Sequence, residues 1–201
     1  FSRMTGYRSI VTDIGGNLNL TTTTRRADIS YNDLSQIEYY QDYVTSSATP
    51  ELVTVIKFGF NGETSQNVEP VYNNLGQLIS YVQATRDVNV NSLDKENLAD
   101  PIVGTKLDIS TTSRRSGIEY NGLGQLKFYQ DYITSNTTPE LGTELRFGFD
   151  GDTGSKVEPV YNPLGQLTSY IQATHEFNID PDYKENPADD PVPFDKLNVY
   201  A

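Results

Sequence analysis

The chain has no cysteine and no tryptophan, and only one histidine among its 201 residues. Without cysteine, neither disulfides nor thiolate metal sites hold the structure together. No apolar run approaches the roughly 20 residues that cross a bilayer, and no signal peptide is recognisable, so we predict no membrane span. Basic residues are scarce too, since 15 of them against 27 acidic residues give a net charge of −12. That excess argues against nucleic acid as a partner, because its backbone is itself densely anionic.

Signatures of catalysis are missing as well. His175 has no His or Cys companion for a metal site, and no partners for a catalytic triad. The chain contains neither a G-x-S-x-G elbow nor a G-x-x-x-x-G-K-S phosphate loop, and no pair of carboxylates stands out for glycoside hydrolysis. We therefore predict a protein that is not an enzyme and has no cofactor, with calcium as the one ion that its acidic loops leave open.

In place of such motifs the chain has repetition. The pattern Y-N-x-L-(G/S)-Q-(L/I)-x-x-Y begins at Tyr31, Tyr72, Tyr120 and Tyr161, and the opening FSRMTGY has the form of the end of a further copy. Tyr31 recurs as Tyr120 and Tyr72 as Tyr161, 89 residues later in both cases. Repetition at this spacing is typical of arrays of supersecondary units that bury surface against their neighbours. Because the chain begins within a copy, we expect it to be a piece of a longer protein.

We interpret each copy as a β-hairpin. Asn tolerates the left-handed conformation and bonds its own backbone, and Gly supplies a positive φ at no steric cost, so Asn-x-Leu-Gly is turn chemistry. Runs rich in Leu, Ile, Val, Tyr and Thr follow it, which favours strands. Ser35 replaces the glycine in the first copy. The predicted turn-forming residues are Asn32, Asn73, Gly76, Asn121, Gly124, Asn162 and Gly165.

Short turns join the predicted strands of one long repeat, which are KLDISTTSRR, GIEYN, QLKFYQDYITS, TELRFGFDG, SKVEPVYN and QLTSYIQATHEFNI. Such a series predicts an all-β fold, an antiparallel meander of repeated β-hairpins that forms a continuous curved sheet or β-strip. Two tandem β-sandwich domains are the alternative. The tight turn at Ile14-Gly15-Gly16-Asn17 stands where the later junctions have a long polar stretch, which favours the continuous sheet.

The repeat period also predicts the domain boundaries. We expect residues 1–17 to be the truncated end of a preceding repeat, residues 18–106 and 107–196 to be two β repeats, and residues 197–201 to start the next. In the fourth strand of each repeat, every second residue is large and apolar. This alternation predicts a buried ridge along one face of the strand. The two expected ridges are Ile56, Phe58 and Phe60, and Leu145, Phe147 and Phe149.

The hairpin motif resembles the YD repeat of the RHS and teneurin class, a bacterial surface repeat, in its YNxLGQL segments. The matching residues are Tyr161, Asn162, Gly165, Gln166 and Leu167, with their counterparts in the other copies. The resemblance implies antiparallel β-strips that spiral into shells or filament-like surface structures, with repeats that are not catalytic. Asn here replaces the family's Asp, Gln replaces its Arg, and the units of 41 and 48 residues are longer than usual. A surface adhesin with its own repeat type fits the same residues.

Three groups of residues are candidates for binding. The tyrosines Tyr40, Tyr81, Tyr129 and Tyr170 either form a ladder on which sugar rings stack or cover one face of the sheet and pair across strands. Asp150 and Asp152 lie in Asp-Gly-Asp-Thr-Gly, which is either a calcium loop or a hairpin turn. A second calcium candidate is the acidic stretch with Asp180, Asp182, Glu185, Asp189 and Asp190.

Two arginine pairs, Arg25-Arg26 and Arg114-Arg115, recur at the same place in the repeat. Adjacent strand residues point to opposite faces, so we expect one arginine of each pair to stack on tyrosine and the other to meet solvent or an acidic neighbour.

These observations predict a non-enzymatic structural segment of a large extracellular or cell-surface β-repeat protein, such as a stalk, shell or filament. The alternative is an adhesin or carbohydrate-binding module that uses the tyrosine-rich face. The expected partners are neighbouring repeats of the same long chain, with self-association or surface glycans as further options.

Overall fold

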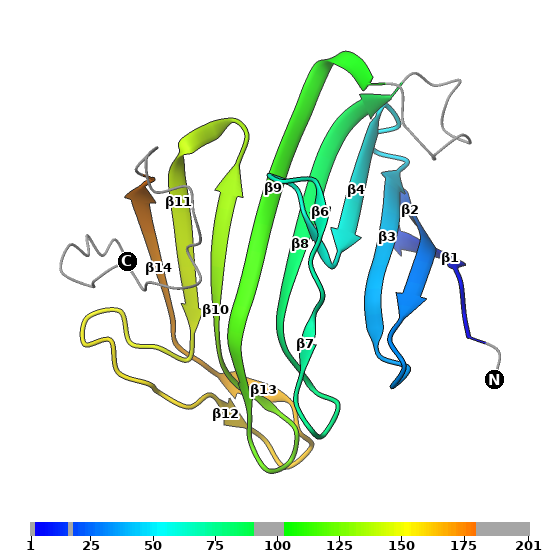
Figure 1. Cartoon of the computed structure of the whole chain (residues 1–201). Coiled ribbons are helices and arrows are strands. Elements are labelled where there is room, and N and C mark those ends of the chain that lie inside the picture. Colours follow the sequence, from blue (N-terminus) through cyan, green and yellow to red (C-terminus); the bar gives the residue numbers. More distant parts are fainter. Residues whose placement is uncertain (1–2, 16–17, 91–102, 180–201) are drawn as a thin grey trace. The chain divides into compact units, whose positions relative to one another are not determined.

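The computed structural model describes residues 3–15, 18–90 and 103–179, and these contain strands and turns but no helix. The long strands form one antiparallel meander in the order β1-β2-β3-β4-β8-β9-β10-β11-β14 (Figure 1). This confirms the predicted all-β antiparallel fold, and the strand order is that of a meander rather than of sandwiches. The main strands are β1 (Tyr7–Gly15), β2 (Leu18–Tyr31), β3 (Ile37–Ser46), β4 (Leu52–Phe58), β8 (Leu78–Val90), β9 (Val103–Tyr120), β10 (Leu126–Ser135), β11 (Thr138–Phe147) and β14 (Gln172–Asn178).

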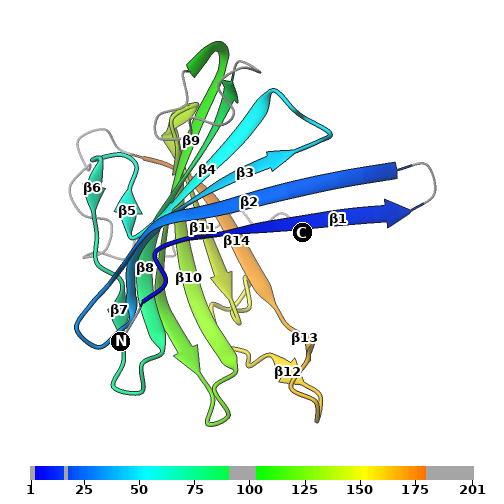
Figure 2. The ribbon, with the colours of Figure 1, turned by 90° about the vertical axis from the view of Figure 1, so that its right-hand side faces the viewer.

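Short strands complete the hairpins. β7 (Val71–Tyr72) pairs with the start of β8, and β12 (Val160–Tyr161) pairs with β13 (Leu167–Ser169). β5 (Phe60–Asn61) pairs with β6 (Gln66–Asn67). β1 and β2 run side by side along their length (Figure 2), and their pairing extends to Gly15 and Leu18. The predicted tight turn between them includes residues 16 and 17, which lie outside the described residues.

The described chain divides into two compact units. Unit 1 comprises Phe1–Pro70 and Tyr81–Thr112, and unit 2 comprises Val71–Ser80 and Ser113–Ala201. β8 and β9 each contribute residues to both units. The repeat boundaries at residues 17, 106 and 196 stay a prediction, and the segment 197–201 lies outside the described residues.

Two predicted strands are in fact one. The sequence predicted a break between KLDISTTSRR and GIEYN, but β9 runs through both as a single strand. β9 continues through Gly117, which has a φ of +59°, and β2 continues through Asp28, at a φ of +54°, where its pairing with β3 shifts at a bulge. A bulge with one residue in the left-handed region bends a strand without ending it. The sequence also predicted one strand over SKVEPVYN. The structure has only the short strand β12 there, with one isolated bridge between Phe149 and Lys156.

The predicted phenylalanine ridge is also wrong at its last residue. β4 ends at Phe58 and β11 at Phe147, because Gly59 and Gly148 follow at φ values of +70° and +76°. A Cβ atom at Gly59 would lie 2.0 Å from the carbonyl oxygen of Glu38, so only glycine allows this approach.

The positive φ of Gly148 turns the backbone, so that Phe149 lies on the opposite face of the sheet from Phe147. Phe149 packs edge-on against Phe128, with ring centroids 5.7 Å apart. Phe128 neighbours Tyr129 in β10 and therefore points away from the face on which Tyr129 stacks on Phe147. Of the residues in the predicted ridges, Phe58 and Phe147 alone are buried, at 6% and 5% exposure.

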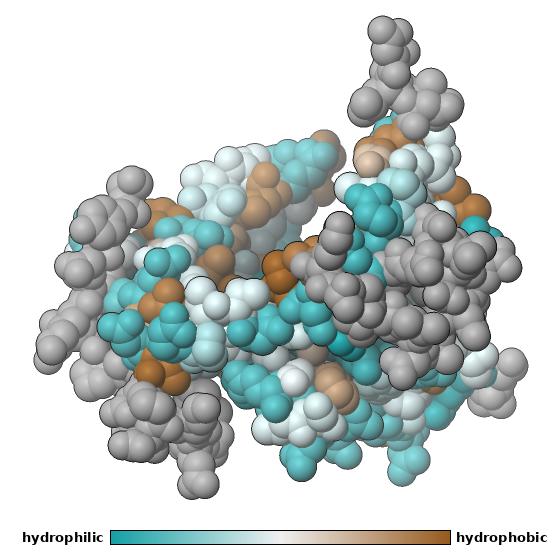
Figure 3. Space-filling view, turned by 90° about the horizontal axis from the view of Figure 1, so that it is seen from above, coloured by the Kyte–Doolittle hydropathy of each residue, from teal (hydrophilic) through white to brown (hydrophobic). Residues whose placement is uncertain are grey.

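The core is thin. In unit 1 the buried cluster consists of Tyr43, Val53, Val55 and Val88, of which Val53 and Val88 are directly opposite in β4 and β8. Burying such a side chain stabilises the fold by about 1.5–3 kcal/mol. On the face seen in Figure 3, apolar residues lie in small groups between polar ones. A sheet with so little dry interior depends on contacts between side chains of neighbouring strands.

Candidate functional site

The most regular side-chain arrangement in unit 1 is a row that crosses four neighbouring strands, and we call it the arginine stack. It consists of Arg26 in β2, Tyr40 in β3, Phe58 in β4 and Tyr81 in β8. The Cζ atom of Arg26 lies 3.5 Å from the centroid of the Tyr40 ring. The Tyr40 and Phe58 rings are parallel within 5° at 5.0 Å, and Phe58 and Tyr81 are 5.1 Å apart.

An aspartate fixes the arginine in this row. The Nε and Nη2 atoms of Arg26 donate to the two carboxylate oxygens of Asp42 at 2.8 and 2.6 Å. Asp42 is only 6% exposed and lies directly opposite Arg26 in the β2–β3 pairing. A bidentate pair satisfies the carboxylate charge in this buried place, and the guanidinium plane remains available to the Tyr40 ring.

Unit 2 builds the same arrangement. Arg115 donates to both carboxylate oxygens of Asp131 at 2.7 and 2.6 Å, and its Cζ lies 3.7 Å from the Tyr129 ring centroid. Tyr129 stacks on Phe147 at 5.1 Å and 5°, and Phe147 lies 5.1 Å from Tyr170. The sequence interpretation missed both aspartates, although Arg-Arg and Tyr-Gln-Asp-Tyr recur with the same separation in the two repeats.

The four candidate tyrosines therefore occupy two kinds of place. Tyr40 and Tyr129 have an arginine over one ring face and a phenylalanine on the other. Burial raises the pKa of both phenols, although the neighbouring guanidinium acts in the opposite direction. Tyr81 is half-buried, whereas Tyr170 is 53% exposed. Sugar binding by this set stays a prediction, and Tyr170 offers the most accessible ring.

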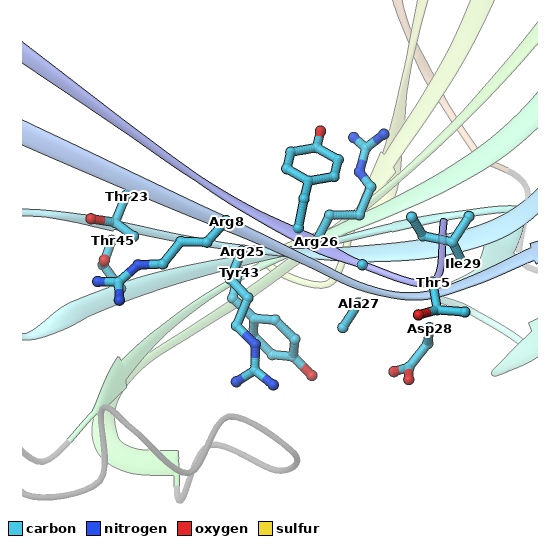
Figure 4. A pocket seen from close by; sticks show the side chains of 12 residues that line it. Thr5, Arg8, Thr23, Arg25, Arg26, Ala27, Asp28, Ile29, Tyr43 and Thr45 are labelled. Atoms are coloured by element: carbon cyan, nitrogen blue, oxygen red, sulfur yellow. The ribbon is translucent and has the colours of Figure 1, made fainter. Parts of the chain in front are cut away.

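The first arginine pair divides as the alternation of strands predicted, whereas in the second pair both arginines lie over a tyrosine ring, Arg114 with its Cζ atom 5.9 Å from the ring centroid of Tyr132 and Arg115 over Tyr129. Figure 4 shows Arg25 and Arg26 on opposite sides of β2. Arg26 belongs to the stack, whereas Arg25 is exposed beside Tyr43, in a groove also lined by Arg8. Arg8 and Arg25 lie directly opposite in the β1–β2 pairing, and in the described part of the chain neither has an ion-pair partner. This groove is open and carries positive charge in a protein that is otherwise acidic.

The four hairpin turns share one set of hydrogen bonds. In the first turn the Oδ1 atom of Asn32 accepts from the backbone N–H groups of Leu34 and Gln36 at 3.0 and 2.9 Å, and its Nδ2 donates to Gln36 Oε1. The residue in the left-handed region is Ser35 here and glycine in the other turns. The same bonds form around Asn73, Asn121 and Asn162, and the glycines are Gly76, Gly124 and Gly165.

A tyrosine hydroxyl ties each of three hairpins to the one before it. Tyr31 in unit 1 donates to the carbonyl oxygen of Met4 at 3.0 Å. In unit 2, Tyr120 donates to Leu78 O at 2.8 Å and Tyr161 to Leu126 O at 2.6 Å. The accepting residue is the first residue after the turn of the preceding copy in every case. The sequence interpretation assigned no role to these tyrosines.

Neighbouring turn tips also touch. In unit 2 a Cβ atom on Gly124 would lie 3.6 Å from the Nε2 of Gln77, and one on Gly165 would lie 3.3 Å from the Nε2 of Gln125. The tips of the β7–β8, β9–β10 and β12–β13 turns accordingly lie side by side in Figure 1.

Each tip carries a leucine that is mostly exposed. Leu34, Leu75, Leu123 and Leu164 are 78%, 83%, 84% and 82% exposed. The turn geometry rests on the asparagine and the glycine, so it does not require leucine. The sequence interpretation missed these exposed leucines as a surface feature. The signal was present, because the fourth position of Y-N-x-L is leucine in all four copies.

The Asp-Gly-Asp-Thr-Gly segment, for which the sequence left a calcium loop and a hairpin turn open, forms a turn in which the Asp150 carboxylate accepts backbone hydrogen bonds. Asp150 Oδ1 accepts from the N–H groups of Asp152 and Thr153 at 3.0 and 2.9 Å. The backbone hydrogen bond from Thr153 lowers the pKa of Asp150. Asn61 makes the equivalent bonds in unit 1, to Glu63 and Thr64, without a negative charge.

No cluster of three or more metal-ligating residues is found within residues 3–15, 18–90 and 103–179. The acidic stretch Asp180, Asp182, Glu185, Asp189 and Asp190 lies outside the described residues. His175, in β14, stacks beside Phe177 at 5.6 Å. That contact places the lone histidine in an aromatic pair.

Comparison with known proteins gave no guide to function, since family models, curated proteins and solved structures all lacked a match to the chain. Over its described residues the chain has no helix with the length and apolar character needed to cross a bilayer.

Proposed function

We propose that the chain is a non-enzymatic structural segment of a large β-repeat protein, in which it forms part of a stalk, shell or filament wall. One observation carries the proposal: the same arginine stack is built in both units, with each of its side chains used to hold one strand to the next. A binding or catalytic site occurs once in most domains, whereas a joint that holds an array together recurs with every repeat.

The hydrogen bonds between hairpins support the same proposal. Tyr31, Tyr120 and Tyr161 each join one copy of the motif to the copy before it. In such an array, stability is approximately the sum of repeat and interface terms, so a repeat gains stability from its neighbours. Neighbouring repeats of one long chain are therefore the partners that we propose first.

A location outside the cell or at the cell surface fits this role. The composition is rich in Thr, Ser, Asn, Tyr and Gly, and it includes no cysteine and one methionine. The resemblance of the hairpins to YD repeats, which belong to bacterial surface proteins, supports the same location.

The test is thermal unfolding of the whole chain and of a chain cut after Lys106, each with and without millimolar calcium. We expect one cooperative transition in the whole chain, a clearly lower midpoint after the cut, and no response to calcium. Equal midpoints for the cut and whole chains would contradict an array of interdependent repeats, and a strong calcium shift would indicate a calcium-stiffened adhesin instead.

Glycan binding is the second candidate, and the exposure of Tyr170 is the observation that favours it. The Tyr170 ring is 53% exposed and backed by Phe147, as a sugar-stacking platform requires. A glycan array probed with the native chain and with Tyr170→Ala tests this function. Binding that Tyr170→Ala abolishes supports it, whereas an absence of binding, or equal binding by both proteins, excludes it.

A further inference from the structure

β14 and β8 hold equivalent places in the two repeats, but they differ in the number of strands that pair with them. β8 pairs with β4 on one side and β9 on the other, and Val82 is 9% exposed. β14 pairs with β11, and in the described part of the chain no strand lies on its other edge. Ile171, which directly precedes β14 and has the place of Val82 in the second repeat, is 40% exposed, and within β14 exposed residues alternate with half-buried ones. One edge of β14 therefore presents unpaired backbone groups beside incompletely buried side chains.

The chain itself shows what covers a strand of this type. Tyr7 in β1 has the same place in the motif as Tyr170, and β2 pairs with β1 so that Arg26 lies directly opposite Tyr7. The Cζ atom of Arg26 is 5.4 Å from the Tyr7 ring centroid. Arg26 is thus placed between an edge tyrosine on one side and Tyr40 with Asp42 on the other.

Tyr170 has only half of these contacts. Phe147 lies against it from β11, as Phe58 lies against Tyr81 in unit 1, but in the described residues no guanidinium lies over its ring. The printed sequence supplies the start of a suitable strand, since Lys196-Leu197 repeats Lys106-Leu107, yet it contains no arginine after Arg146. By comparison with the contact of Arg26 and Tyr7, an arginine-bearing strand of the β9 type would complete the contacts of Tyr170.

We propose that the free edge of β14 is the docking surface for the first strand of a following repeat, and that an arginine of this strand stacks on Tyr170 as Arg26 stacks on Tyr7. The inference rests on the proposed structural function, because it needs a further repeat in series. Main-chain pairing supplies affinity at such an edge, and the side chain opposite Tyr170 supplies specificity. Lysine does not replace this arginine, because it lacks the planar fork that binds aspartate and aromatic ring together.

The experiment is a chain extended after Lys196 by a second copy of residues 107–147, which carries its own Arg115, Tyr129 and Asp131. Backbone amide exchange of β14 is measured by NMR in the original and the extended chains. We expect the outward-facing amides of β14 to exchange at least about tenfold more slowly in the extended chain, because a paired edge opens only by local unfolding.

Matched variants test the arginine itself. In the appended copy, Arg115→Lys is expected to remove most of the added protection, whereas Arg114→Ala, on the opposite face of the strand, is expected to keep it. Protection that is the same in both variants would overturn the stacking of an arginine on Tyr170. Unchanged exchange of β14 beside a folded extension would overturn the docking surface altogether.

A second measurement keeps the inference testable if the extension does not fold. In the original chain, Arg26→Ala is expected to speed amide exchange in β1, and Arg25→Ala is not, because Arg26 alone faces Tyr7. Equal exchange in the two variants would overturn the arginine contact as the basis of edge recognition. Failure of the structural function itself is a separate result, namely equal stability of the whole chain and the chain cut after Lys106.

Discussion

The two units agree on one face of their strands and differ on the other. On the face of the arginine stack, the arginine lies 3.5 Å from its tyrosine in unit 1 and 3.7 Å in unit 2, and both tyrosine–phenylalanine pairs are parallel within 5°. On the reverse face, unit 1 has Val53 opposite Val88, where unit 2 has Gly142 opposite Phe177. Two medium side chains are replaced there by the smallest residue and a large one.

The next position on the reverse face differs in kind. Val55 is buried in the core of unit 1, whereas its counterpart Glu144 forms an ion pair with Arg146 at 2.7 Å. The face of the arginine stack thus has the same residues and geometry in both units. On the reverse face, only the summed volume of the paired side chains is similar between the units. A stack that is the same in both units, beside a reverse face that is filled in different ways, is what the proposed structural function expects of a joint between strands.

The largest expected effect comes from breaking the joint. Arg26→Ala and Arg115→Ala should each lower the free energy of unfolding by about 3–5 kcal/mol, because each leaves a buried aspartate without its ion-pair partner. Urea unfolding measures the change. Arg25→Ala is the matched control and should be neutral or slightly stabilising, since Arg25 lies directly opposite Arg8. Equal losses for Arg25→Ala and Arg26→Ala would remove the distinction between the two faces.

The reverse face should tolerate exchange between the units. Gly142→Val alone should cost about 1–3 kcal/mol, because a Cβ atom there would lie 2.6 Å from the Phe177 ring. Adding Phe177→Val recreates the pair of unit 1 and should recover about 0.5–3 kcal/mol as a coupling energy in a double-mutant cycle. Additive effects of the two changes would contradict volume exchange as the rule on this face.

The hydroxyl bonds between hairpins should have a smaller effect. Tyr161→Phe removes the hydrogen bond to Leu126 O and should cost about 0.5–1.5 kcal/mol in urea unfolding. Tyr170→Phe is the control, because its hydroxyl makes no hydrogen bond within the described residues, and it should leave the midpoint unchanged. A loss as large for Tyr170→Phe would show that phenol removal acts through packing alone.

Alkaline pH should weaken the joint in both units. Burial raises the pKa of Tyr40 and Tyr129, so folding favours their neutral phenols. Their contribution to stability is complete below the ordinary tyrosine pKa of about 10 and is lost as pH rises through the folded value. Unfolding free energies at about pH 8 and about pH 11 should show this loss, and the double variant Tyr40→Phe, Tyr129→Phe should show less of it. An equal loss in the variant would assign the effect to other groups.

The smallest effect is expected at the turn tips. Leu75→Ser, Leu123→Ser and Leu164→Ser should each change the unfolding free energy by no more than about 0.5 kcal/mol, because these side chains are more than 80% exposed. A marked loss in thermal unfolding would show that the tips contribute to the fold, which their exposure argues against.

The sequence predicted the parts of the fold that depend on local chemistry. Asn-x-Leu-Gly gave the turns, and the alternation of apolar and polar residues gave antiparallel strands in a meander. Single glycines caused the errors. β9 continues through Gly117, whereas β4 and β11 end directly before Gly59 and Gly148, and the sequence does not separate these outcomes because they depend on the neighbouring strand.

The arginine stack was predictable only in part. Alternation along the strand placed Arg25 and Arg26 on different faces, and the repeat marked Tyr40 and Tyr129 as equivalent. The contact with Asp42 and Asp131 was not predicted, because it depends on the register between two strands, which a bulge near Asp28 shifts. Without knowledge of that register, the sequence predicted an open ladder of tyrosines. The structure instead covers the Tyr40 and Tyr129 rings with a guanidinium on one face and a phenylalanine on the other.

The most direct test of a structural array is the unfolding free energy of chains with one, two and three long repeats, measured by urea denaturation. If joints between repeats hold the array together, each added repeat should raise the unfolding free energy by more than the unfolding free energy of one isolated repeat. The reason is that each addition contributes one interface as well as one repeat. A free energy that does not change with the number of repeats would contradict the account, since each repeat would then fold as an independent domain.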